Sequence, residues 1–170
     1  MDMERLVQAR ALLEDVTPLR SDCGRLCGGA CCQGERGDAH GMLLFPGEAA
    51  LYVSAAWAQV TPLPYALGGA PALLLTCDGT CPRAQRPLAC RLFPLFCRMR
   101  DTGADVTLDP RARGVCPLFR YGLQGLSQDF VRAARESYGL LMQDDEGRAF
   151  LQDLSDACSL GVTRPARGAR

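Results

Sequence analysis

Four cysteines fall within ten positions near the N-terminus, in the segment CGRLCGGACC at residues 23–32. A second group stands in CDGTCPRAQRPLACRLFPLFC at residues 77–97, and one more cysteine follows at position 116. The C-x3-C-x3-C spacing would place three thiols on one face of a helix, but the interspersed glycines disfavour a helix there. We therefore expect loops, in which glycine lets the backbone wrap closely round a bound ion.

The rest of the sequence indicates why so many thiols are present. The opening segment MDMERLVQARALLEDV is charged and amphipathic, so we expect no secretory signal. No stretch approaches the roughly 18 apolar residues of a membrane span. These observations predict a cytoplasmic protein that does not engage a membrane. Thiols stay reduced in that compartment, so ten cysteines indicate metal binding in preference to a disulfide scaffold.

Zinc and iron–sulfur clusters both bind cysteine as thiolate and take about four sulfur ligands each. Nine cysteines precede the C-terminal helices, enough for two sites or for one cluster with spare thiols. Cys97 is a weaker candidate, because alternation in a predicted strand also places it in the core. Cys158 continues the apolar stripe of the last predicted helix, which indicates a core position. The candidate metal ligands are Cys23, Cys27, Cys31, Cys32, Cys77, Cys81, Cys90 and Cys116.

Charged and polar neighbours of the thiols complete the candidate site. Arg86, Arg91 and Arg98 are interleaved with the second cysteine group. Four thiolates around a divalent zinc leave a charge of about −2, which nearby guanidinium groups offset. We expect Arg86 and Arg91 beside the metal ligands. His40 lies in a Gly-rich segment, where a metal ligand and a solvated loop residue are both compatible with the sequence.

Hydrophobic periodicity and turn residues outline the remaining elements. They predict an α-rich small α+β fold, with irregular metal-organised cysteine loops and a short β-hairpin packed on several helices. Helices are expected at 2–16, 46–58, 127–142 and 146–159, a short strand at 73–77, a hairpin at 93–109 and an irregular connection at 61–72. One domain is expected overall, with a cysteine-cluster region at 1–122, a C-terminal helical pair at 123–160 and a flexible tail at 161–170.

The two cysteine groups together resemble the bacterial YkgJ-like family, whose members are described as zinc- or iron-chelating. The family pattern has an N-terminal CxxxCxxCC or CxxCxxCC, a Glu-bearing helix, and a later cysteine segment that runs into RP-x2-CR-x-(F/Y)P. Here residues 23–32 correspond to the first element and RPLACRLFP at 86–94 to the last. The gap from Cys27 to Cys31 holds three residues where the family has two. The resemblance covers roughly residues 20–120 and implies zinc, iron or an iron–sulfur cluster as the cofactor.

The sequence thus predicts a metal-binding cysteine-cluster protein whose principal partner is the metal ion. Two alternatives remain open at this point: a metal-dependent or iron–sulfur enzyme or redox protein, and a zinc-ribbon-like module that binds a protein partner. The formal net charge of zero argues against nucleic acid as a partner, because such proteins carry a basic face. Whether the chain is an enzyme is not decided by its residues, which include one histidine and no evident catalytic triad.

Overall fold

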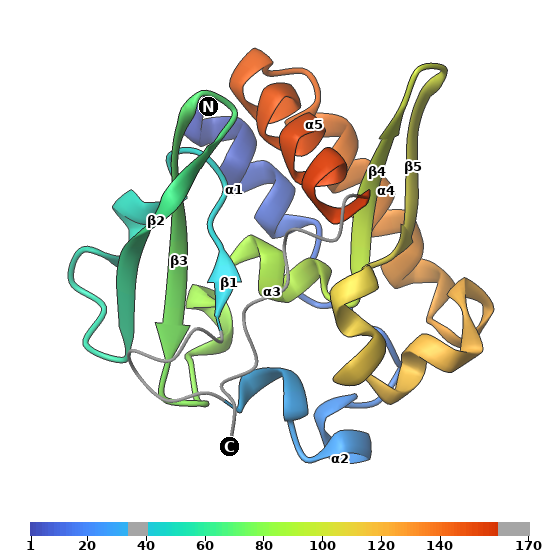
Figure 1. Ribbon diagram of the computed structural model, residues 1–170. Helices are drawn as coiled ribbons and strands as arrows, with labels where there is room; N and C mark the ends of the chain where they lie inside the picture. Colours follow the sequence, from blue (N-terminus) through green and yellow to red (C-terminus); the bar gives the residue numbers. More distant parts are fainter. Residues whose placement is uncertain (34–40, 160–170) are drawn as a thin grey trace.

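The computed structural model describes residues 1–33 and 41–159 as two small antiparallel sheets with helices packed between them (Figure 1). The α-helices are α1 (Met3–Ala11), α2 (Gly24–Cys27), α3 (Leu88–Leu92), α4 (Gln128–Leu141) and α5 (Asp145–Ser159). Short 3-10 helices are η1 (Ala30–Cys32), η2 (Glu48–Tyr52), η3 (Arg83–Gln85), η4 (Pro110–Gly114), η5 (Pro117–Tyr121) and η6 (Leu123–Gly125). The strands are β1 (Met42–Leu43), β2 (Ala58–Leu67), β3 (Ala70–Cys77), β4 (Leu95–Arg100) and β5 (Gly103–Leu108).

The three-stranded sheet has the order β1-β3-β2, with β3 in the centre. β2 and β3 form a hairpin across Gly68 and Gly69, whose φ angles of 62° and 77° require residues without a Cβ. The sheet tolerates Pro62 and Pro64 because β2 is an edge strand, where a missing N–H need not break a ladder on both sides. The last residue of β3, Cys77, pairs with Ala58, so the sheet places this thiol at its lower end in Figure 1.

The second sheet is the two-stranded hairpin of β4 and β5, which runs from Leu95 opposite Leu108 to Arg100 opposite Gly103. It projects beyond the helices at the right of Figure 1. α5 packs along β4, and the backbone N–H of Met99 donates to the Ser155 hydroxyl over 3.0 Å. This contact fixes the last helix against the hairpin that follows the second cysteine group.

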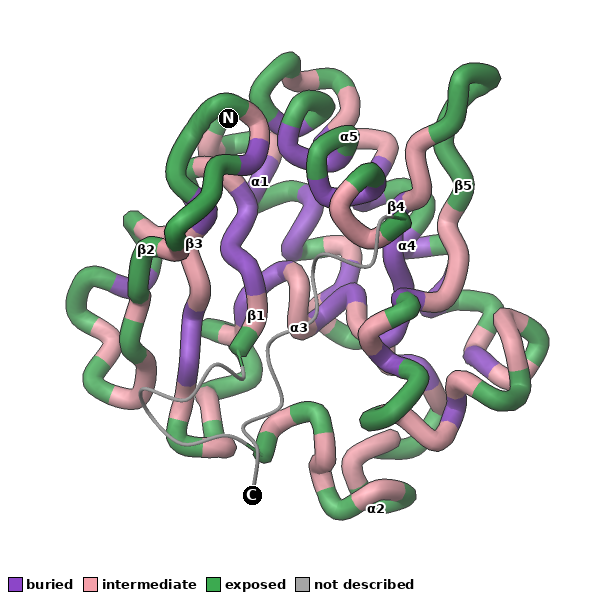
Figure 2. The backbone as a smooth tube through the Cα atoms, in the orientation of Figure 1, coloured by how far each residue is buried: buried purple, intermediate pink, exposed green. Residues whose placement is uncertain are grey.

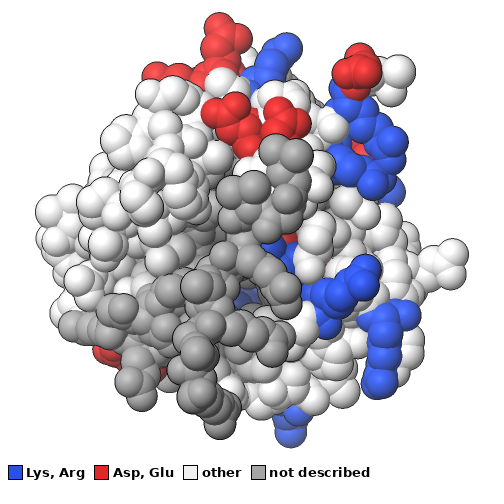
Figure 3. Space-filling model, viewed as in Figure 1, with Lys and Arg blue, Asp and Glu red and all other residues white. Residues whose placement is uncertain are grey.

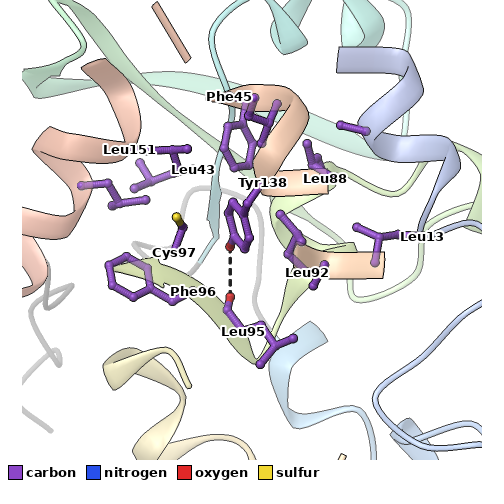
Figure 4. Close-up of a cluster of buried hydrophobic side chains, with 14 of the residues drawn as sticks. Leu13, Leu43, Phe45, Leu88, Leu92, Leu95, Phe96, Cys97, Tyr138 and Leu151 are labelled. Atoms are coloured by element: carbon purple, nitrogen blue, oxygen red, sulfur yellow. Dashed lines mark hydrogen bonds between the residues drawn. The ribbon is translucent and has the colours of Figure 1, made fainter. Parts of the chain in front are cut away.

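The main core lies between α1, α3, α4, α5 and the two sheets and forms a large cluster of buried side chains, and a smaller second cluster holds Leu44, Tyr52 and Leu75 (Figure 2). Leu6 of α1, Leu88 of α3 and Phe130 of α4 each have an exposed fraction of 0% and belong to the large cluster. Figure 4 shows Tyr138 crossing the core, where its hydroxyl donates to the Leu95 carbonyl over 3.3 Å. Cys97 points into the same cluster from β4.

A buried ion pair joins the N-terminal helix to η2 and α3. The Arg10 guanidinium donates to the Glu48 carboxylate over 2.6 Å, and Glu48 is fully buried. The same carboxylate accepts from the N–H groups of Leu88, at 2.7 Å, and Phe45, at 3.2 Å. Burial raises the pKa of Glu48, and these donors act in the opposite direction. The carboxylate thereby holds the first turn of α3 in place.

The expected fold class is wrong in its proportions. The chain is a small α+β protein, but it is not clearly α-rich, and it has two antiparallel sheets where one short hairpin was expected. The helix expected at 46–58 is only the 3-10 turn η2, and the irregular connection expected at 61–72 is the β2–β3 hairpin. The first cysteine group is not a plain loop either, because α2 and η1 each form about one helical turn.

Other elements agree with the sequence. The hairpin at 93–109 and the two C-terminal helices are confirmed by β4–β5, α4 and α5, and the strand at 73–77 is the end of β3. The first helix is confirmed but stops at Ala11. His40 and the tail at 161–170 lie outside the described residues. Within the described ranges, no helix is long and apolar enough to cross a bilayer.

Candidate metal centre

The first cysteine group is folded as two consecutive short turns below α3 (Figure 1). The Asp22 carboxylate accepts from the N–H of Gly24 over 3.0 Å and opens α2. Gly28 and Gly29 then adopt φ angles of 63° and 70°, which reverse the chain between the second and third thiols. Because side chains are strained at such angles, glycine at these positions allows four cysteines to approach one another within ten residues.

The second cysteine group approaches the first through a glycine turn. Gly79, in the turn after β3, has a φ of 81°, and a Cβ at this position would lie 3.0 Å from the carbonyl oxygen of Cys32. The turn carrying Cys77 and Cys81 therefore packs directly against the adjacent cysteine pair. A larger residue at position 79 would push the two groups apart.

α3 carries the third thiol of the second group. Pro87 is the N-cap residue, directly before Leu88. Leu88 and Leu92, one turn apart, are fully buried on the core side at 0% and 1% exposed. Cys90, two residues from each, consequently faces the other way, toward the cysteine groups. Burial raises the pKa of the Cys90 thiol well above its ordinary value, and Cys32 and Cys81 add to this effect.

Six of the eight candidate ligands line one cavity of about 80 Å³. They come from three separate stretches of the chain, and the cavity wall is completed by apolar side chains and by three arginines. The lining thiols are Cys23, Cys27, Cys31, Cys32, Cys90 and Cys116. The other two candidates, Cys77 and Cys81, lie outside this lining but within reach of it, because both raise the pKa of Cys90 and Cys32 raises the pKa of Cys77.

The adjacent cysteine pair has the most polarised thiols. The Sγ atoms of Cys31 and Cys32 are 3.9 Å apart and share a hydrogen bond. This bond lowers the pKa of Cys32 to about 6, with help from Arg86 and against the effect of burial. The same bond and burial raise the pKa of Cys31. The shared hydrogen bond therefore favours a thiolate on one member of the pair while the other keeps its proton.

Arg86 lies among the thiols of both groups. Burial lowers its pKa, but the nearby Cys81, Cys32 and Cys90 outweigh that effect and raise it overall. The Nε atom of Arg86 is buried without a hydrogen-bond partner within the described residues. A buried donor without an acceptor is unusual in native proteins, and a neighbouring thiolate is an acceptor it can use.

The other two arginines of this segment have different partners. Arg91 donates to the carbonyl oxygens of Arg86, Arg83 and Ala84 over 2.9, 3.0 and 2.9 Å, and it also pairs with the Glu14 carboxylate. It therefore shapes the loop that presents Arg86. Arg98 lies away from the cavity on the β4–β5 hairpin, where Arg98 and Arg100 pair with Asp105 over 3.7 and 2.8 Å. Figure 3 shows basic side chains gathered along that hairpin.

The remaining cysteines belong to the core. Cys97 is 1% exposed, and burial raises the pKa of its thiol to about 11. Cys158 on α5 is half-buried and packs against the same apolar cluster. None of the ten cysteines, all of which lie in the described residues, forms a disulfide. Cys97 and Cys158 thus lie outside the cavity lining, whereas Cys23 and Cys116 both line the cavity and pack against the core.

The chemistry of the donor set fits a thiophilic metal. Zinc–sulfur bonds of about 2.3 Å place the sulfurs of a tetrahedral site about 3.8 Å apart, close to the 3.9 Å between Cys31 and Cys32. Among the described residues, no three candidate side chains are arranged closely enough to hold one metal ion. Rotation about χ1 moves each Sγ between staggered positions, so binding requires the thiols to turn toward a common centre.

Comparisons with known proteins add no relative to this picture. No protein-family model matches the chain, and no curated protein or solved structure matches it either. The class of site is therefore defined by its own residues: a partly buried, thiol-rich cavity with one arginine among the sulfurs. The resemblance to the YkgJ-like family rests on the sequence motifs alone.

Glu48 is the functional residue that sequence reasoning did not single out as part of the site. Its carboxylate accepts from the N–H of Leu88 and so supports the first turn of α3, two residues before Cys90. The available signal was a lone carboxylate in the apolar stretch LLFPGEAALY. A charged residue in such a setting needs a buried partner.

Proposed function

We propose that this chain is a metal-binding cysteine-cluster protein that holds zinc, or iron as an iron–sulfur centre. The ligands are drawn from Cys23, Cys27, Cys31, Cys32, Cys77, Cys81, Cys90 and Cys116. The observation that carries the proposal is the convergence of six of these thiols, from three stretches of the chain, on one cavity. A core assembled only for stability would bury leucines there, because clustered thiolates repel one another unless a cation neutralises them.

The roles of individual residues follow from their contacts. The thiols bind the metal as thiolates and release their protons on binding. Arg86 neutralises part of the remaining negative charge, since its guanidinium interacts with Cys81, Cys32 and Cys90. Glu48 and Arg91 act through the backbone, because they hold the first turn of α3 and the loop before it. A bound zinc ion would act as a Lewis acid. A bound iron–sulfur centre would transfer electrons.

The direct test is the metal content of the full chain purified anaerobically with a reductant. Stoichiometric zinc in a colourless protein, or iron with sulfide in a brown one, supports the proposal and identifies the metal. The Cys158→Ala variant should keep the same metal content as the unaltered chain, because this cysteine packs on the core outside the cavity. A chain that is folded but takes up neither zinc nor iron, even after incubation with each metal, contradicts the proposal.

A further inference from the structure

Two segments that line the thiol cavity carry arginine and no acidic residue. Residues 23–33 and 110–128 hold four arginines between them and no Asp or Glu. The first segment lines the cavity through its cysteines, and the second lines it through residues 115–118. We call these two segments the cavity rim. The rim is basic although the formal net charge of the whole chain is zero.

Most of this positive charge is not neutralised within the described part of the chain. Three rim arginines are exposed and pair with no described carboxylate: Arg25, Arg113 and Arg120. The fourth, Arg111, pairs with Asp109 over 2.6 Å. Asp22 also lines the cavity, and its carboxylate accepts from the N–H of Gly24. The rim therefore presents three guanidinium groups that a carboxylate from another molecule can reach.

Aromatic rings hold two of these guanidinium groups in place. The Arg113 guanidinium lies over the Phe119 ring, 5.4 Å from its centroid, and that of Arg120 lies over the Tyr121 ring at 4.8 Å. A guanidinium stacked on a ring keeps the N–H groups at its edge free, and these can bind a carboxylate through two hydrogen bonds. Because stacking already restricts the side chain, less conformational entropy is lost when an acidic group binds.

Exposed apolar side chains lie in the same two segments. Leu26, next to Cys27, is 56% exposed, Val115 is 41% exposed, and Tyr121 is 54% exposed. Val115 also lines the cavity, so it lies at the cavity mouth. Arginine and tyrosine beside apolar side chains are the composition of protein–protein interfaces.

The same side chains favour a protein over a nucleic acid as the partner. Leu26 and Val115 are aliphatic and offer no ring on which a base could stack. One face of the Phe119 ring and one face of the Tyr121 ring are already covered by a guanidinium. Single-stranded nucleic acid is bound chiefly by open aromatic faces next to basic side chains, and this surface has few of them.

Charge is distributed unevenly over the described surface. Figure 3 shows basic side chains at the lower right, over the region that η4 and η5 occupy in Figure 1, and acidic side chains at the top, over α5. α5 contributes Asp145, Glu146, Asp153 and Asp156. An acidic partner is therefore attracted toward the cavity rim and repelled from α5, which orients it as it approaches.

We propose that the cavity rim binds an acidic protein partner. Carboxylates of the partner pair with the three exposed rim arginines, and its apolar side chains contact Leu26, Val115 and Tyr121. Because Val115 lies at the cavity mouth, a partner bound there covers the opening above the thiols. The inference uses surface residues alone and holds whether or not the thiols bind a metal.

The test measures fluorescence anisotropy of a labelled peptide, in which glutamate and leucine alternate, as the reduced full chain is added. Binding should saturate and should weaken as the salt concentration is raised. The double variant Arg113→Glu/Arg120→Glu should bind the peptide at least about tenfold more weakly, because like charges then face each other. A second peptide, with serine in place of leucine, should bind the unaltered chain more weakly than the first.

The matched control is the double variant Arg5→Glu/Arg148→Glu, which has the same net charge. Its changes lie on α1 and α5, outside the rim, and it should bind the first peptide as tightly as the unaltered chain does. Circular dichroism verifies that both double variants are folded.

Four results would overturn the inference. The first is that the glutamate–leucine peptide does not bind. The second is that both double variants weaken binding equally, which would mean attraction by net charge alone. The third is equal binding of the serine peptide, which would remove the apolar contacts. The fourth is that a single-stranded RNA oligonucleotide binds more tightly than the peptide and is weakened by Arg113→Glu/Arg120→Glu, which would make the rim a nucleic-acid surface.

Discussion

Replacement of Glu48 by alanine tests how much the buried carboxylate stabilises the fold around the candidate site. Glu48 is fully buried and accepts from Arg10, from the N–H of Leu88 and from the N–H of Phe45. Its removal leaves the Arg10 guanidinium, whose side chain is 10% exposed, with the Tyr52 hydroxyl as a close partner at 2.8 Å. Two buried backbone donors also lose their acceptor.

The magnitude follows from these losses. Removing one partner of a buried ion pair typically costs about 3–5 kcal/mol, because the other charge stays buried and uncompensated. Burial raises the pKa of Glu48, so part of the attraction in the native protein is offset by desolvation. We therefore expect the lower part of that range, about 3 kcal/mol, for Glu48→Ala. Glu48→Gln should cost less, since an amide oxygen still accepts from the N–H of Leu88.

Urea unfolding of the metal-free, reduced protein, followed by far-ultraviolet circular dichroism, measures this loss as a shift of the midpoint at constant slope. Asp129→Ala is the matched control. Asp129 pairs with Arg132 at the surface, where both side chains are more than 60% exposed, so its loss should cost under about 1 kcal/mol. If Glu48→Ala and Asp129→Ala unfold at the same urea concentration, the buried pair contributes no net stability and the reasoning is refuted.

Three further predictions concern the thiols and their surroundings. The Arg86→Ala variant should lose metal to a competing chelator faster than Arg113→Ala, because the Arg113 guanidinium lies over the Phe119 ring. Equal rates of loss would show that Arg86 does not stabilise the bound metal. Chelation under reducing conditions should raise amide exchange across residues 23–33 and 77–92 far more than in α4 and α5, and unchanged protection would mean that the thiols do not hold these segments. Cys97 should be alkylated more slowly at pH 8 in the folded chain than the half-buried Cys158, because Cys97 is 1% exposed and burial raises its pKa to about 11; equal labelling by mass spectrometry would contradict its core position.

Local pattern predicted the elements whose side chains have a clear periodicity. α4, α5 and the β4–β5 hairpin follow from apolar spacing and from the turn at residues 101–102, which depend little on distant contacts. The β2–β3 hairpin was missed because Pro62, Pro64 and Pro71 indicated an irregular segment. Recognising that these prolines fit a sheet requires the strand order, which the sequence does not show. Gly68-Gly69 between two apolar runs was nevertheless a usable signal for a hairpin.

The candidate site was predictable in its residue types and less so in its geometry. Cysteine spacing identified the candidate thiols, but the approach of the two groups across the turn at Gly79 is a tertiary contact that spacing does not show. The contributions of Glu48 and Arg91 were not accessible, because both act on backbone groups at the start of α3 and in the loop before it. Such contacts depend on tertiary packing, which residue spacing along the chain does not encode.

Helix α3 also has a consequence for how sequences of this kind can diverge. Within its five residues, Leu88 and Leu92 are committed to the core, Cys90 to the cavity and Arg91 to three carbonyl oxygens of the preceding loop. A substitution at any of these four positions disturbs a different part of the molecule, so neighbouring changes have little scope to compensate for one another. Descendants of this chain should therefore accumulate changes in the exposed edge strand β2 and at the tip of the β4–β5 hairpin long before α3 can vary.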